Sequence, residues 1–133
     1  MKRLFIIPFL LMAAAYSSAQ QFCGHYTNQE LKISLEINLS ADSIAVPGIP
    51  DEWCYGYLRG NLNGTWIILK VESQKDRKAT VRTACDNGSD SQTIELVQTD
   101  DKTITMRQVG DANIKTIQGR KYVKLPKAIE FKK

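Results

Sequence analysis

The residues best suited to covalent chemistry lie near the start of the chain, where one residue separates Cys23 from His25. A thiolate and an imidazole can act together as nucleophile and general base, but they must meet in space and need a third group to orient the base. Two residues apart on a strand, these side chains share a face with Cβ atoms about 7 Å apart. We therefore expect His25, the single histidine of the chain, to be an ordinary surface or rim residue.

Other patterns that carry catalysis or bind metals are missing from the sequence. A serine nucleophile would depend on His25 as its base, and no Gly-x-Ser-x-Gly elbow occurs. The adjacent acids Asp51 and Glu52 would point to opposite sides of a strand, whereas paired catalytic carboxylates must face one another. One histidine and three scattered cysteines give no zinc site of ordinary spacing. We expect no enzyme activity, no cofactor and no bound metal.

The densest aromatic cluster is Trp53-x-Tyr55-x-Tyr57, which would place three aromatic side chains on one face of a strand. Arg59 follows on the same face, and Trp66 lies across an Asn-Gly turn, diagonal to Tyr57. Such a face can be the core of the sheet, or it can bind a ligand. The core is the simpler interpretation, but burying the opposite face, which holds small residues, would expose the aromatic face. The candidate ligand-binding residues are Trp53, Tyr55, Tyr57, Arg59 and Trp66.

Strand periodicity must position these residues. Residues 31–39 alternate leucine or isoleucine with other residues, which indicates a half-buried strand. Between turn signals, further strands are predicted at 44–46, 52–60, 65–72, 78–85, 91–98, 102–109, 113–118 and 121–125. Two prolines predict a rigid loop from Pro47 to Asp51. The expected fold is all-β: a single antiparallel meander, barrel or sandwich, of about eight to nine short strands.

The first 19 residues have the order of a secretory signal peptide. Lys2 and Arg3 precede an apolar run, and small residues lead to a predicted cleavage site after Ala19. The run is shorter than the roughly 20 residues of a permanent membrane span. We expect an exported protein, periplasmic or extracellular, divided into a signal peptide (1–19), an all-β domain (20–125) and a basic C-terminal tail (126–133).

Three cysteines follow the predicted cleavage site, so an exported chain can form one disulfide. Strand direction alternates in a meander and places Cys54 and Cys85 at opposite rims, whereas a disulfide needs Cα atoms within about 7 Å. Continuing the alternation back to the first strand places Cys23 at the rim of Cys85. The sequence therefore predicts a Cys23–Cys85 disulfide, with Cys54 left as a buried thiol.

The overall plan is similar to that of many small periplasmic or extracellular β-barrels, lipocalin-like proteins and small inhibitor proteins among them. The leading expectation is a non-enzymatic binding module that holds a small amphipathic ligand or an extended surface on the aromatic strand face. The alternative is a periplasmic inhibitor or immunity-type protein that docks on another protein through rigid loops such as 47–51. We expect a monomer. We also expect no binding to nucleic acid, because removing Lys2 and Arg3 lowers the formal net charge from +4 to only +2.

Overall fold

Residues 21–88 and 90–133 are described by a computed structural model, and within them the fold is all-β. The predicted signal peptide lies outside these residues. The strands are β1 (Cys23–Asn28), β2 (Ile33–Asn38), β3 (Ile44–Ala45), β4 (Trp53–Cys54), β5 (Gly56–Gly60), β6 (Trp66–Lys75), β7 (Lys78–Cys85), β8 (Ser91–Asp100), β9 (Thr103–Val109), β10 (Lys115–Gln118), β11 (Lys121–Lys124) and β12 (Ile129–Lys132).

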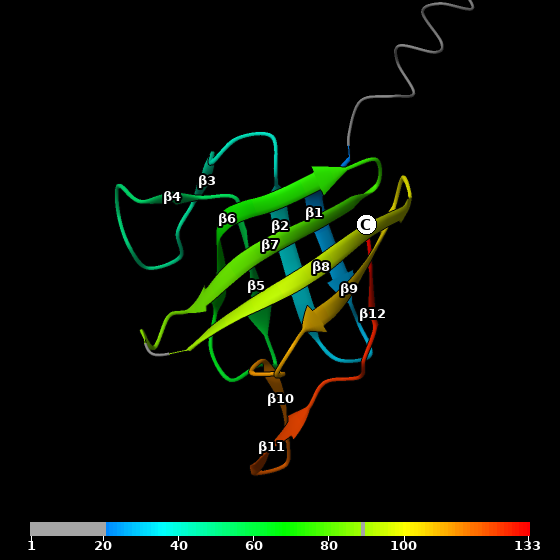
Figure 1. The fold of residues 1–133 in the computed structure, drawn as a ribbon. Coiled ribbons are helices and arrows are strands. Elements are labelled where there is room, and N and C mark those ends of the chain that lie inside the picture. The colour runs from blue at the N-terminus through cyan, green and yellow to red at the C-terminus, as the bar shows by residue number, and fades with distance from the viewer. Residues whose placement is uncertain (1–20, 89) are drawn as a thin grey trace, which may run out of the picture.

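Eight of these strands form a closed antiparallel barrel in the order β1-β12-β9-β8-β7-β6-β5-β2 (Figure 1). Barrel strands that follow one another along the chain are neighbours, and β12 closes the barrel by pairing with both β9 and β1. The predicted meander is therefore confirmed, and the structure is a barrel rather than a sandwich.

Two small hairpins interrupt the meander, one at each end of the barrel. The β3–β4 hairpin lies between the end of β2 and the start of β5, and the β10–β11 hairpin lies between β9 and β12. Each forms its own two-stranded sheet, and Thr116 of β10 makes one further bridge, to Leu62 after β5. Figure 1 shows the two hairpins at opposite ends of the barrel. The segment at 44–46 is thus a strand, as predicted, but it is not part of the meander.

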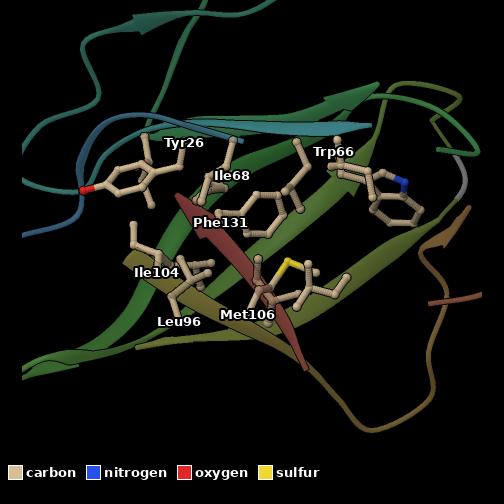
Figure 2. Close-up of a cluster of buried hydrophobic side chains, with 14 of the residues drawn as sticks. Tyr26, Trp66, Ile68, Leu96, Ile104, Met106 and Phe131 are labelled. Atoms are coloured by element: carbon tan, nitrogen blue, oxygen red, sulfur yellow. The ribbon is translucent and has the colours of Figure 1, made fainter. Parts of the chain in front are cut away.

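The barrel interior is filled by side chains. Alternation along β2 points Ile33, Leu35 and Ile37 inward, where all three are buried. Figure 2 shows large side chains from β1, β6, β8, β9 and β12 meeting in the centre. Those labelled are Tyr26, Trp66, Ile68, Leu96, Ile104, Met106 and Phe131, and every one of them is buried. This is the packing of a small barrel whose core is solid.

Side-chain amides hold the segment before β10 across one end of the barrel. The Gln92 Oε1 atom accepts from the Asn113 N–H at 2.8 Å, and the Gln108 Oε1 atom accepts from the Ile114 N–H at 2.9 Å. Asn63 Oδ1 accepts from both the Lys115 N–H and the Trp66 indole. Ile114 is fully buried by this arrangement. The end of the barrel that carries β10–β11 is therefore closed.

The segment predicted as a basic C-terminal tail is instead a barrel strand. Ile129 and Phe131 in β12 point into the core and are buried, while Glu130 and Lys132 between them are exposed. Burial of a Phe and an Ile side chain stabilises the fold by about 1.5–3 kcal/mol each. The basic residues of this segment lie on its outer face, so its charge does not indicate a frayed end.

Candidate functional site

The predicted strand 52–60 is divided by a bend at Tyr55, so its aromatic residues do not share one face. Tyr55 packs against the main core, whereas Tyr57 packs against a separate cluster outside the barrel. Trp53 belongs to β4 and is 58% exposed. Strict alternation across the bend was therefore the wrong assumption, and the predicted continuous aromatic face does not form.

Trp66 also lies away from the predicted face. It pairs with Leu58, one residue from the predicted Arg59, and its ring is fully buried in the barrel. The indole Nε1–H donates to Asn63 Oδ1 at 3.0 Å. Trp66 is thus a core residue with a satisfied polar atom, and Arg59 is exposed on the outer surface.

The β3–β4 hairpin has one packed face and one exposed face. Val46 and Cys54 are buried with Ile67 of β6, which attaches the hairpin to the outside of the barrel. The opposite face presents Ala45 and Trp53, a cross-strand pair, to solvent. The hairpin is anchored by its inner face, so its outer face is held in place.

An exposed apolar surface results, which we call the hairpin patch: Ala45, Ile49 and Trp53. Ile49, at the tip of the rigid loop predicted at 47–51, is 49% exposed. The loop is tied by a Val46 N–H bond to the Glu52 carbonyl at 3.0 Å and by an Ile49 N–H bond to the Val46 carbonyl at 3.2 Å. Leu69, 55% exposed, belongs to β6, the strand that β4 contacts. Ile49, Trp53 and Leu69 are three of the five large exposed apolar side chains among the described residues.

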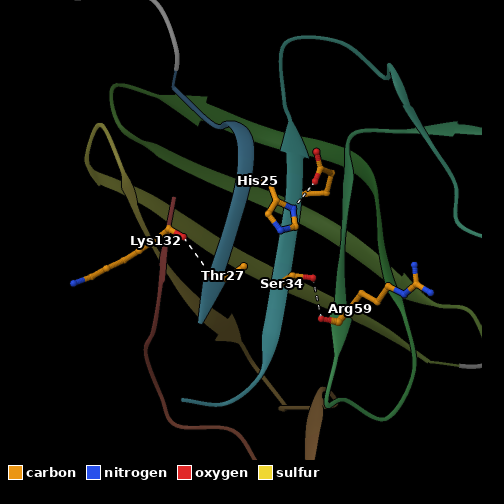
Figure 3. A network of polar contacts seen from close by, with 6 residues as sticks. His25, Thr27, Ser34, Arg59 and Lys132 are labelled. Carbon is orange, nitrogen blue, oxygen red and sulfur yellow. Dashed lines mark hydrogen bonds and ion pairs between the residues drawn. The ribbon is translucent and has the colours of Figure 1, made fainter. Parts of the chain in front are cut away.

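Polar side chains cover the outer surface of β1, β2 and β5 (Figure 3). His25 Nδ1 lies 2.7 Å from Glu36 Oε2 on the neighbouring strand. A second row crosses the same strands: Ser34 pairs with Arg59, and Thr27 pairs with both Ser34 and Lys132. His25 is exposed, as expected for a surface residue.

Two shallow hollows flank this polar row, of about 370 Å³ towards β12 and about 360 Å³ towards β5. A third, of about 230 Å³, lies over Arg82 and Asn113. Trp53, Tyr55 and Tyr57 line none of these three hollows of the described surface.

The predicted Cys23–Cys85 disulfide is absent, and all three cysteines are free thiols. In the closed barrel, three strands separate β1 from β7 in either direction, and the two residues lie at opposite rims. The prediction failed because it counted 44–46 as a strand of the meander, which reversed the direction assigned to the first strand. Cys54 and Cys85 do lie at opposite rims, as predicted.

Two of the thiols are held in the neutral form. Burial raises the pKa of Cys54, against the opposing effect of its hydrogen bond to the Gly56 carbonyl. Burial also raises the pKa of Cys85, and the nearby carboxylates of Asp86 and Asp90 add to that effect. Neither is suited to nucleophilic chemistry, which requires a lowered thiol pKa.

Residues 21–88 and 90–133 contain no group of three or more His, Cys, Asp or Glu side chains that could hold a metal ion. Among the same residues, no helix is long and apolar enough to cross a membrane. The fold and surface define the class of molecule, a small up-and-down barrel with a filled interior and an exposed apolar hairpin. No protein-family model, no curated protein and no solved structure matches the chain.

Proposed function

We propose that this protein is an exported, non-enzymatic binding protein that docks on another protein through the hairpin patch. This is the second of the two functions expected from the sequence. The observation that carries it is the anchored β3–β4 hairpin, which exposes a tryptophan and an isoleucine to solvent. Tryptophan is among the residues that most often dominate the binding energy of protein interfaces.

The packing of the barrel supports this choice over a ligand held inside. Tyr26, Trp66 and Phe131 occupy the centre of the barrel. The end at β10–β11 is covered by chain that is hydrogen-bonded to the side-chain amides of Gln92 and Gln108. A drug-sized ligand needs a pocket of roughly 300–1,000 Å³ that buries most of its surface. The hollows of such size described here are shallow and lie on the outer surface. An amphipathic small molecule therefore has less support than a protein partner.

The shape of the hairpin favours recognition with little rearrangement. Its loop holds Pro47 and Pro50, which restrict the backbone, and its inner face is packed on Ile67. A preorganised loop loses little conformational entropy on binding. If the predicted signal peptide exports the protein, its partner lies in the periplasm, on the cell surface or outside the cell.

The proposal is tested by purifying the protein from its native host under mild conditions and identifying by mass spectrometry what accompanies it. The identified protein is then purified, and its dissociation constant is measured against wild type, Trp53→Ala, Ile49→Ala and Tyr122→Ala. Tyr122 is a matched control because it is 65% exposed and belongs to β11, at the other end of the barrel.

We expect Trp53→Ala to weaken binding roughly 30-fold, the effect of losing an interface hot spot. Ile49→Ala should weaken it less, and Tyr122→Ala should leave it within about twofold of wild type. Equal effects of Trp53→Ala and Tyr122→Ala would contradict the proposal. A small molecule that accompanies the protein without any protein partner would favour the first function expected from the sequence.

A further inference from the structure

A second site lies on the outer polar surface, away from the hairpin patch. It is the shallow hollow of about 360 Å³ over β1, β2 and β5, too open to enclose a drug-sized ligand but accessible to a small ion. Its polar lining consists of two cations, two hydroxyls and two amides, from Lys32, Arg59, Thr27, Ser34, Asn28 and Gln29. Buried Ile33 also lines it. We call it the β1–β2–β5 hollow.

The charge of this hollow is positive and uncompensated. Its lining contains no Asp or Glu, and Lys32 and Arg59 form no ion pair within the part of the chain that the structure describes. Glu36, two residues beyond Ser34 on β2, is paired with His25. Two unpaired cations in a concave site raise the local concentration of anions.

The backbone fixes the position of Lys32 and the approach of β5 at this hollow. Lys32 has φ +60°, in the left-handed region that residues other than Gly, Asn and Asp seldom adopt. Across the strand pair, a Cβ at Gly60 would collide with the Lys32 carbonyl oxygen, so Gly60 permits the close approach of β5. Lys32 ends the turn between β1 and β2 and is one of four residues other than glycine with positive φ among the described residues, so its backbone does not by itself indicate a ligand.

The two hydroxyls of the hollow are weakly engaged. Ser34 Oγ donates to the Arg59 carbonyl at 3.3 Å, and Thr27 Oγ1 donates to the Lys132 carbonyl at 3.5 Å (Figure 3). Hydroxyl hydrogen bonds are usually 2.5–3.0 Å long, so these contacts can be exchanged for a better acceptor at small cost. Figure 3 shows the Arg59 guanidinium extended away from Ser34, so the side chain would have to rotate to close on a ligand.

We propose that the β1–β2–β5 hollow binds an oxyanion, the sulfate, phosphate or carboxylate group of a ligand. Lys32 and Arg59 supply the charge, and Arg59 can donate two parallel hydrogen bonds to such a group. The Ser34 and Thr27 hydroxyls and the Gln29 amide supply further donors. The Asn28 amide nitrogen already donates to the Glu130 carbonyl at 2.9 Å, and its oxygen accepts from the Leu31 N–H at 2.8 Å. This site is separate from the hairpin patch and does not depend on the function proposed above.

The test is NMR titration of the ¹⁵N-labelled protein, purified from its host, with sodium sulfate and, separately, with sodium D-glucuronate. Ionic strength is kept constant with sodium chloride, because salt screens surface charges. The variants are Arg59→Gln and Lys32→Asn, the latter chosen because asparagine tolerates the left-handed backbone. Lys70→Gln is the matched control, since it removes one exposed positive charge on β6, outside the hollow.

We expect saturable shifts at the Lys32, Ser34 and Arg59 amides, and a dissociation constant roughly 10- to 100-fold higher in Arg59→Gln and Lys32→Asn. Lys70→Gln and Trp53→Ala should stay within about twofold of wild type. Tighter binding of sulfate indicates a tetrahedral oxyanion, and tighter binding of glucuronate indicates an acidic sugar. Shifts that never saturate, or an equal loss in Lys70→Gln, would overturn the proposal.

Discussion

At the scale of single residues, the fold depends on buried polar side chains whose hydrogen bonds are all satisfied. Among the described residues, every buried side-chain nitrogen and oxygen has a partner. Gln98 is the most connected: its Oε1 accepts from the Phe22 N–H at 2.8 Å, and its Nε2 donates to the Tyr26 hydroxyl and the carbonyls of Asp100 and Thr103. It joins β8 and β9 to β1 beside the short β1–β12 pairing.

Replacing Gln98 should therefore cost more than replacing an exposed glutamine. In Gln98→Leu, the buried Phe22 N–H loses its acceptor, and we expect the free energy of unfolding to fall by about 1–3 kcal/mol. Gln74→Leu on the exposed part of β6 is the control and should change it by less than about 0.5 kcal/mol. Urea denaturation measures both, and equal midpoints for the two variants would show that the Gln98 bonds do not stabilise the fold.

The thiols provide a second test at this scale. Burial raises the pKa of Cys54 and Cys85, so at pH 7–8 both hold less reactive thiolate than an ordinary cysteine. We expect iodoacetamide to label the half-buried Cys23 first and the other two more slowly, with the labelling of Cys54 and Cys85 rising as pH increases. Mass spectrometry should find all 3 cysteines labelled in denaturant without reductant. A single labelled cysteine would instead show that a disulfide forms.

At the scale of elements, the sequence predicted strands well wherever alternation was regular, as in residues 31–39 and 78–85. The strand prediction failed where a local bend gave a segment a different pairing strand. The bend at Tyr55 moves β4 into a separate sheet. Gly56 beside it was the available signal, because a Cβ there would collide with the Glu36 carbonyl oxygen. This single bend separated the aromatic candidates. β12 was missed although Ile129 and Phe131 alternate with polar residues, because the surrounding lysines resembled a solvated tail.

The C-terminal strand is expected to be essential for stability. Phe131 is fully buried and belongs to the strand that closes the barrel, so Phe131→Ala should lower the free energy of unfolding by about 3–5 kcal/mol. Lys132→Ala, one residue further along the same strand but exposed, should change it by less than about 0.5 kcal/mol. Thermal or urea denaturation distinguishes these outcomes. If both variants match wild type, β12 does not hold the barrel closed.

At the scale of the whole molecule, turn spacing and strand period were sufficient to predict an antiparallel meander. Closure into a barrel and the filling of its interior depend on how side chains from distant strands meet, such as Tyr26 with Gln98, which local pattern does not encode. For the same reason, the sequence could not decide whether its aromatic residues were core or surface. The structure places Trp66 in the core and Trp53 on the surface, so the two tryptophans do not share one face.

The central claim is that a partner protein binds the outside of the barrel at the β3–β4 hairpin, and photo-crosslinking in the native host tests it most directly. Trp53→p-benzoylphenylalanine and, as control, Tyr122→p-benzoylphenylalanine place the same reactive group at opposite ends of the barrel. After irradiation, we predict a discrete adduct with one protein at position 53 and none at position 122. The same adducts at both positions, or no protein adduct at position 53, would contradict the account.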